Sequence, residues 1–278
     1  MPVLMSELAG LRDLADAYDV FLVDQFGVLH DGVKPYAGTP EALMALKAAG
    51  KTILLLSNSG KRSAPNEARL RQLGFPQGSW DHFLSSGEVA WSILERQGGQ
   101  RCKCLLIARD GDRSAIEGLP LDVVEDGRDA DVVLISGSEA ERIELDHYRE
   151  LLRPAAERAV PAYCTNPDKI MLTAVGPRPG AGHIAEIYEE MDGPVHWIGK
   201  PYGDIYEAAW TMLGQPARER VLCVGDSIEH DIAGGTHAGF ATALVATGIL
   251  ASMNAAERES LFAEHNVRPD FLLPGFVW

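Results

Sequence analysis

Cysteine is scarce in this sequence, with four residues in 278, and each lies in or beside an apolar run. We expect buried thiols, because free cysteine is usually buried. Only one residue separates Cys102 from Cys104, which is not the spacing of the common zinc knuckle, and no matching Cys or His pair lies nearby. The cysteines therefore argue against a structural zinc site.

Long apolar runs are absent from the sequence, and positively charged residues are fewer than negatively charged ones. No apolar run reaches membrane-spanning length, and the start MPVLMSELAG lacks the basic region and apolar stretch of a secretory signal. Lys and Arg number 25 against 40 Asp and Glu, a formal net charge of -15. Such a charge repels phosphodiester backbones and anionic membrane faces. We expect a cytoplasmic protein whose partners include neither nucleic acid nor a membrane.

What is present is ordinary globular composition, with 46% hydrophobic and 23% charged residues. Short β-rich runs alternate with amphipathic stretches, a pattern typical of a parallel sheet with helices on both faces. The pattern predicts a doubly wound, Rossmann-like α/β core with strands at 20–24, 52–57, 221–226, 241–247 and 270–274.

Two helices are predicted to cross over between these strands. The first covers 39–50, with Thr39 as its N-cap and Gly50 as its end, and the second covers 203–214, with Asp204 as its N-cap. The length allows a core plus a second unit.

The middle of the chain has strands and a helix of its own. Apolar runs at 104–109, 131–137, 161–165 and 170–175 predict strands, and 145–158 predicts a helix. We therefore expect an inserted α/β domain over 87–197, with the core formed by 1–86 and 198–278.

Polar residues follow the predicted core strands. In a parallel sheet, ligands bind beyond the carboxyl ends of the strands, so these residues should converge. They are Asp24, Ser57, Asn58, Asp226 and Asp231, with Lys200 just before a helix. Three carboxylates, a lysine and a hydroxyl can bind a divalent cation, hold a phosphoryl group and attack it.

Four motifs resemble those of the haloacid dehalogenase superfamily, in the same order: FLVDQFGVLHDG, LLLSNSG, GKPYGDIY and VGDSIEHDIAGG. The insert, with TNPD and GPRPGAGHI, further resembles the class IIA capped branch of sugar-phosphate and nucleotide phosphatases. The resemblance implies a core with a class II cap domain, and hydrolysis of a small phosphorylated metabolite with Mg²⁺ as cofactor.

Carried over to this chain, the resemblance makes Asp24 the nucleophile that forms an acyl phosphate. Ser57 would form a hydrogen bond to a phosphoryl oxygen. Lys200 would offset negative charge on both the nucleophile and the phosphoryl group. Asp226 would bind Mg²⁺ with the Asp24 carboxylate and the backbone carbonyl of Phe26. Asp231 would hold the magnesium shell, or Lys200, from behind.

Phe26 departs from the family pattern, because the phosphatases carry there a second aspartate that acts as general acid and base. Such a group typically contributes about 10²- to 10⁴-fold in rate. Three explanations stay open: His30 or Asp31 takes over the role, the substrate has a leaving group that needs no acid, or the bond cleaved is not a phosphomonoester.

Dehalogenases of the superfamily carry tyrosine at this place and phosphonatases carry alanine, so a carbon–halogen or carbon–phosphorus hydrolase is one alternative. Because those dehalogenases work without metal, Asp226 and Asp231 favour magnesium and phosphate. A second alternative is a binding or regulatory module that keeps the pocket but has lost efficient turnover.

Inside the insert, Thr165, Asn166 and Asp168 would line the mouth of the crevice and contact substrate together with Asn58 and Ser59. Asn-Pro is also a common turn initiator, so an Asx turn is the competing interpretation. Ser59 stands where the class IIA branch usually has a second asparagine. Relatives of this branch often pair through their caps, which implies a possible homodimer.

Overall fold

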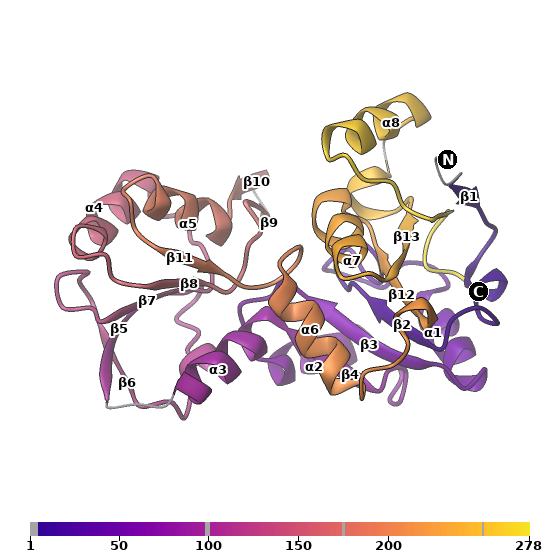
Figure 1. Cartoon of the computed structure of the whole chain (residues 1–278), viewed down its shortest axis with the longest axis horizontal. Helices are drawn as coiled ribbons and strands as arrows, with labels where there is room; N and C mark the ends of the chain where they lie inside the picture. Colours follow the sequence, from indigo (N-terminus) through magenta and orange to yellow (C-terminus); the bar gives the residue numbers. More distant parts are fainter. Residues whose placement is uncertain (1–4, 98–100, 174–175, 252) are drawn as a thin grey trace. The chain divides into compact units, whose positions relative to one another are not determined.

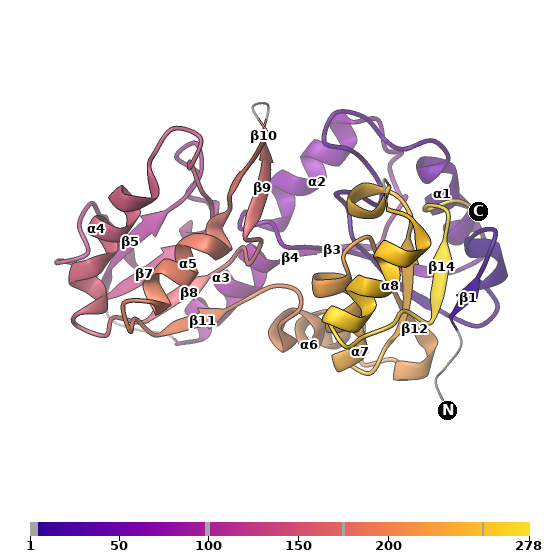
Figure 2. The ribbon, with the colours of Figure 1, turned by 90° about the horizontal axis from the view of Figure 1, so that it is seen from above.

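The computed structural model describes residues 5–97, 101–173, 176–251 and 253–278. The chain divides into two compact units, drawn in Figures 1 and 2. The first consists of Met1–Ser57, Glu67–Leu84 and Lys200–Trp278, and the second of Asn58–Asn66 and Ser85–Gly199.

The first unit is built on a seven-stranded sheet. In spatial order its strands are β1 (Ser6–Glu7), β14 (Phe271–Leu273), β13 (Ala241–Val245), β12 (Val221–Gly225), β2 (Val20–Val23), β3 (Thr52–Ser57) and β4 (His82–Ser85). The pairings from β1 through β3 are all parallel. The five predicted core strands are confirmed, whereas β1 and β4 were not predicted.

Helices and apolar side chains cover both faces of this sheet. The helices are α1 (Thr39–Ala48), α6 (Gly203–Met212), α7 (Ala233–His237) and α8 (Ala255–Glu264), together with the part of α2 (Ser63–Gln72) from Glu67 onward. Shorter turns are 3-10 helices at Leu11–Asp13, Arg218–Arg220 and Gly248–Leu250, and a π-helical turn at Ile228–Ile232.

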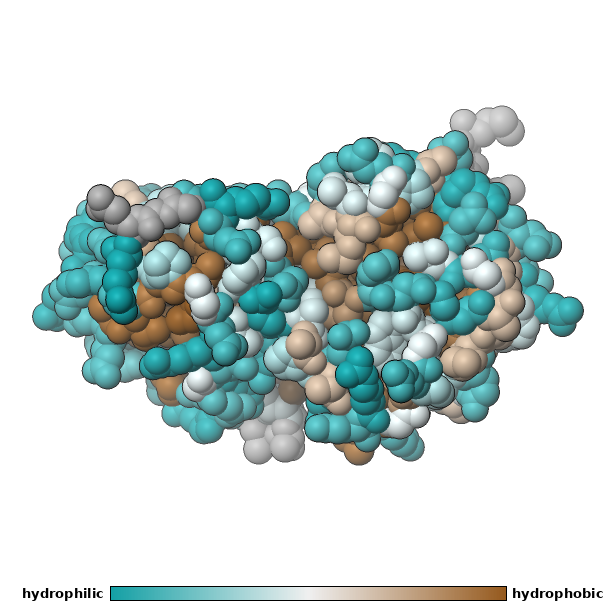
Figure 3. Space-filling view, turned by 90° about the horizontal axis from the view of Figure 1, so that it is seen from below, coloured by the Kyte–Doolittle hydropathy of each residue, from teal (hydrophilic) through white to brown (hydrophobic). Residues whose placement is uncertain are grey.

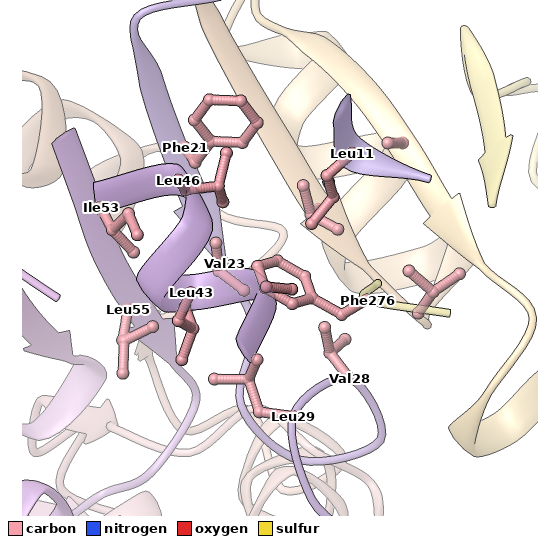
Figure 4. Packing of buried hydrophobic residues seen from close by; sticks show 14 of the residues in the cluster. Leu11, Phe21, Val23, Val28, Leu29, Leu43, Leu46, Ile53, Leu55 and Phe276 are labelled. Atoms are coloured by element: carbon pink, nitrogen blue, oxygen red, sulfur yellow. The ribbon is translucent and has the colours of Figure 1, made fainter. Parts of the chain in front are cut away.

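One core cluster joins α1 to β2 and β3, with Leu46 beside Phe21 and Ile53 and Leu43 beside Leu55 (Figure 4). A second cluster, around Phe262, joins α8 and the π-helical turn to the sheet. Apolar packing from helices on both sides is the doubly wound arrangement that the sequence predicted.

Both predicted helix caps are wrong. The N-cap of α1 is Gly38, with φ +85°, and Thr39 is the first helical residue, whose buried hydroxyl donates to the carbonyls of Leu29 and Tyr36. The N-cap of α6 is Tyr202, so Asp204 lies inside the first turn. The Thr39 hydroxyl thus donates to the preceding loop, whereas an N-cap hydroxyl accepts from a backbone N–H of the first turn.

The second unit contains a five-stranded parallel sheet. Its order is β11 (Val195–Trp197), β8 (Ala162–Cys164), β7 (Val132–Ile135), β5 (Cys102–Ile107) and β6 (Leu121–Val124). Its helices are α3 (Ser86–Gln97), α4 (Leu145–Ala156) and α5 (Ala181–Glu189), with a 3-10 turn at Ser114–Ile116. α4 and α5 pack side by side on one face, through Leu152 and Ile184 among others (Figure 2).

The predicted strand at 170–175 has a different role from the one expected. Ile170–Thr173 forms β9, which pairs antiparallel with β10 (Gly176–Pro179) as a separate two-stranded ribbon. Ala174 and Val175 lie outside the described residues. The other three predicted strands of the insert, and its predicted helix, are present as β5, β7, β8 and α4.

The segment 58–66 belongs to the second unit, although the sequence assigned it to the core. A Cβ on Gly60 would lie 2.1 Å from the Ser136 carbonyl oxygen, so the backbones touch there. Arg62 bonds both carboxylate oxygens of Glu88 at 2.6 Å and lies 4.1 Å above the ring centre of Trp91. These contacts with α3 attach the segment to the second unit.

Among the described residues, no helix is both long and apolar enough to cross a membrane. Hydrophilic side chains cover most of the face drawn in Figure 3, with apolar areas between them. All four cysteines are free thiols; Cys104, Cys164 and Cys223 are buried as predicted, whereas Cys102 is half-buried.

Candidate active site

Three neighbouring strands of the first unit carry the candidate catalytic residues at their carboxyl ends. Asp24 directly follows β2, Ser57 is the last residue of β3, and Asp226 directly follows β12. β2 lies between β3 and β12, and all three strands are parallel. The sheet therefore brings these residues to one edge, as the sequence predicted.

Lys200 links Asp24 to a second aspartate. Its Nζ lies 2.6 Å from Asp24 Oδ1 and 2.7 Å from Asp231 Oδ1, and the three side chains are only 4%, 12% and 6% exposed. Burial alone would lower the pKa of Lys200, but the charges of Asp231 and Asp24 raise it above its ordinary value. Lys200 is therefore the positive counter-charge of both carboxylates.

A third carboxylate, Asp226, lies beside this pair, so the cluster would carry excess negative charge when all three carboxyl groups are ionised. One carboxylate oxygen from each of Asp24, Asp226 and Asp231 lies within 4.8 Å of the others. Burial raises the pKa of Asp24 well above its ordinary value. Burial, followed by the charge of Asp231, raises the pKa of Asp226 to about 7. A hard divalent cation would balance this charge, so the oxygen ligands present here fit Mg²⁺.

Asp226 is held in a cradle of backbone. Its Oδ2 accepts a hydrogen bond from the Ile249 N–H at 2.9 Å. A Cβ on Gly27 or Gly248 would lie 2.1 Å or 1.9 Å from the same oxygen, so only glycine fits at either position. Thr247 closes the cradle, because its hydroxyl donates to the Gly27 carbonyl at 2.7 Å. The carboxylate is therefore fixed before any cation binds.

Asp231 uses both of its oxygens within the protein. Oδ1 pairs with Lys200, and Oδ2 accepts from the Ser227 N–H at 3.1 Å. The π-helical turn Ile228–Ile232 brings the side chain back toward the end of β12, where a Cβ on Gly225 would lie 2.1 Å from it. This geometry favours the supporting role behind Lys200 over direct contact with a cation.

Gln25 is a site residue that the sequence reasoning missed. Its Nε2 donates to Ser57 Oγ at 2.7 Å and so joins the ends of β2 and β3. The only signal in the sequence was its position, since it directly follows Asp24 at the end of a buried strand.

Phe26 presents its ring to solvent, with 44% of the residue exposed. The ring meets His30 edge-on, with the ring centres 5.8 Å apart. His30 itself is buried, and burial, followed by the charge of Arg69, lowers its pKa to about 4. His30 is therefore a neutral imidazole at physiological pH.

Asp31 is bonded within its own turn. Its Oδ1 accepts hydrogen bonds from the N–H groups of Val33 and Lys34, both at 2.8 Å. The bonds from Lys34 and Val33 lower the pKa of this exposed carboxyl, which is therefore ionised and serves as a turn residue.

The predicted substrate contacts lie in the second unit, and three of them bond one another. Asn58 Nδ2 donates to Asp168 Oδ1 at 2.8 Å, and Asn166 Oδ1 accepts from the Asp168 N–H at 3.1 Å. The second bond is the Asx turn that was the competing interpretation of TNPD. Both asparagines therefore have structural partners within the unit.

Ser59 and Thr165 lie beside the first turn of α3. The Ser86 hydroxyl donates to both of their carbonyls, at 3.1 Å and 2.5 Å. The Thr165 hydroxyl is fully buried and has no hydrogen-bond partner among the described residues. The backbones of Ser59 and Thr165 thus help to hold segment 58–66 within its unit.

Comparison with known proteins gives the family. Residues 21–121 match the family model of haloacid dehalogenase-like hydrolases, and residues 197–276 match one described as HAD-hydrolase-like. The sugar-phosphatase AraL of Bacillus subtilis is 30% identical over 233 residues, which cover 82% of each chain.

Two solved structures share the fold at 28% sequence identity. A haloacid dehalogenase-like hydrolase from Brucella suis 1330 has a TM-score of 0.83 and covers 97% of this chain and 100% of its own. A p-nitrophenyl phosphatase from Archaeoglobus fulgidus has a TM-score of 0.74, with 93% and 97% covered. The chain therefore belongs to the haloacid dehalogenase-like hydrolases.

Proposed function

We propose that the chain is a magnesium-dependent phosphatase of a small phosphorylated metabolite, acting through a phospho-aspartyl intermediate on Asp24. The observation that carries the proposal is Lys200, buried and bonded to Asp24 at 2.6 Å and Asp231 at 2.7 Å beside a third carboxylate. The phosphatase names of AraL and the Archaeoglobus enzyme support the reaction type.

Asp24 supplies the nucleophile. A carboxylate oxygen attacks phosphorus, the bond from phosphorus to the leaving oxygen breaks, and water then hydrolyses the acyl phosphate and restores Asp24. Lys200 keeps the attacking oxygen oriented and offsets the charge of the phosphoryl oxygens. The Ser57 hydroxyl donates a hydrogen bond to one of those oxygens.

The carboxylates of Asp24 and Asp226 would hold the metal together with the backbone carbonyl of Phe26, and Asp231 would fix Lys200 behind them. When bound, Mg²⁺ offsets phosphoryl charge and aligns the substrate. The backbone cradle of Asp226 supports this assignment, because a ligand fixed in advance loses little freedom when a cation binds.

The second unit would act as a class IIA cap that selects the substrate. Thr165, Asn166 and Asp168 would contribute contacts, with Asn58 and Ser59 from the loop after β3. A homodimer formed through this unit is part of the same proposal, and gel filtration with light scattering tests it.

Phosphate release from sugar, acyl and aryl phosphates, with Mg²⁺ and after chelation, tests the proposal. Asp24→Asn should abolish release, whereas Asp13→Asn, an exposed acid of the same unit, should not change it. Full turnover by Asp24→Asn would disprove the phospho-aspartyl route. Activity that survives exhaustive chelation would point instead to the metal-free chemistry of a dehalogenase.

A further inference from the structure

Phe26 has no proton to give to a leaving group. By the family resemblance it stands where phosphatases carry the acid, two residues after the nucleophile. Its ring is held in place, because it packs edge-on against His30 and a Cβ on Gly32 would lie 3.1 Å from it. With 44% of the residue exposed, Phe26 places an apolar side chain, and no proton donor, two residues after Asp24.

His30 does not replace the missing acid. Its Nδ1 accepts a hydrogen bond from the Gly32 N–H at 3.0 Å, so the ring hydrogen lies on Nε2. Nε2 is buried and has no hydrogen-bond partner among the described residues. A general acid must reach its acceptor directly or through one water, and a nitrogen enclosed in this way does neither.

Three further polar residues near Asp24 are unsuited to the role of general acid. Asp31 Oδ1 is held by two backbone N–H groups. Lys200 Nζ donates to two buried carboxylates, which would be left without a counter-charge if it gave up a proton. Gln25 carries an amide, which transfers no proton at ordinary pH.

We propose that the substrate is a phosphate ester or anhydride whose leaving group departs unprotonated as a stable anion: an acyl, enol or aryl phosphate. This inference rests on the phosphatase proposed above and names its substrate class. The apolar side chain of Phe26 favours the same class, because an apolar surface suits a planar or aromatic leaving group better than a polyol.

The reaction balances without an acid from the protein. Asp24 Oδ forms a bond to phosphorus, and the leaving oxygen takes the electron pair of the broken bond and departs as an anion. Water then attacks the acyl phosphate, Asp24 regains its carboxylate, and phosphate carries away both water hydrogens. The net change is substrate dianion plus water to leaving-group anion plus dihydrogen phosphate.

The test is the dependence of kcat/KM on the acidity of the leaving group. We would assay 4-nitrophenyl, 4-chlorophenyl, phenyl and butyl phosphate with Mg²⁺. The parameter kcat/KM reports the step that expels the leaving group. Wild type should show a steep fall from 4-nitrophenyl to butyl phosphate, because no group shares a proton with the departing oxygen.

Two variants form a matched pair. Phe26→Asp introduces a proton donor and should raise kcat/KM for phenyl and butyl phosphate by about 10²-fold or more, with little gain for 4-nitrophenyl phosphate. Phe26→Asn has nearly the same shape but transfers no proton, so it should keep the steep dependence. A difference between them isolates proton transfer from packing.

A shallow dependence in wild type would overturn the inference while leaving the phosphatase intact, provided that release still disappears in Asp24→Asn. A steeper dependence in His30→Gln than in wild type would identify His30 as the acid and would also overturn it. No Asp24-dependent release from any compound would instead remove the proposed function itself, and the inference with it.

Discussion

Gln25 Nε2 donates a hydrogen bond to Ser57 Oγ at 2.7 Å, although 32 residues separate the two in the chain. Because Gln25 donates, the serine oxygen accepts in this bond and its own hydrogen points elsewhere. Ser57 is the residue whose hydroxyl would bond a phosphoryl oxygen. Gln25 therefore sets the direction of that hydroxyl.

Gln25→Glu should reverse this bond. An ionised carboxylate has no hydrogen to donate, so the Ser57 hydroxyl would turn toward it and away from the substrate. We expect kcat/KM for 4-nitrophenyl phosphate to fall about tenfold, the equivalent of one charged hydrogen bond. The ratio of variant to wild-type kcat/KM should rise again as pH falls toward about 4, where the new carboxyl regains a proton and donates as glutamine does.

The double variant shows whether Gln25 acts through the hydroxyl. In a Ser57→Ala background, Gln25→Glu should cost little further activity, because the group that it orients is gone. An undiminished loss in that background, or a ratio that does not change with pH, would mean that Gln25 acts in another way.

Stabilisation by Mg²⁺ should grow with pH. Burial and the charge of Asp231 raise the pKa of Asp226 to about 7, so its folded-state contribution is favourable while it is protonated. That contribution is present below its ordinary pKa of about 4 and is lost as pH rises through about 7. Bound Mg²⁺ needs ionised ligands, so the rise in Tm on adding Mg²⁺ should increase over the same range.

Asp226→Asn is the matched variant for this measurement. It keeps the shape of the side chain but does not titrate, so most of the rise in Tm and its pH dependence should disappear together. An equal rise in Tm at low and high pH in wild type would show that Mg²⁺ binds elsewhere.

Glu88 should stabilise the segment 58–66. Its carboxylate bonds Arg62 twice at 2.6 Å and accepts from the Ser63 N–H at 3.1 Å. We expect Glu88→Gln to lower the free energy of unfolding in urea by about 1 kcal/mol, because the pair is half-exposed and partly screened. Glu95→Gln, an exposed change in the same helix, is the control and should have almost no effect. Equal stability of the two variants would contradict this role of Glu88.

The strands that carry the candidate site were predictable from the sequence because they are short, continuous apolar runs. All four residues of β2 and all five of β12 are buried apolar residues or glycine, and each strand is followed by an aspartate. The edge strand β1 has two exposed residues, and α2 buries only Leu70. Such elements leave little hydrophobic periodicity, so the sequence did not reveal them.

The partners of the site residues were harder to predict than the residues themselves. Motif spacing found Asp24 and Lys200, whereas the bond from Gln25 to Ser57 depends on how two strands lie side by side. Likewise, segment 58–66 follows a core strand in sequence, but Arg62 pairs with Glu88 in the other unit. Contacts of this kind depend on tertiary packing, which local pattern does not encode.

Hydrolysis of the phospho-aspartyl intermediate is the second step of the proposed reaction. By the family resemblance, Phe26 stands where an acid would also activate water against the phospho-aspartyl group, so hydrolysis of the proposed intermediate should be slower than its formation from an activated substrate. Rapid mixing with 4-nitrophenyl phosphate should then give a burst of nitrophenol equal to the enzyme concentration, followed by a slower steady rate. Phe26→Asp should shrink the burst, because it speeds the second step, whereas Phe26→Asn should keep it. Linear release from the first turnover in wild type would show that the intermediate does not accumulate and would contradict this prediction.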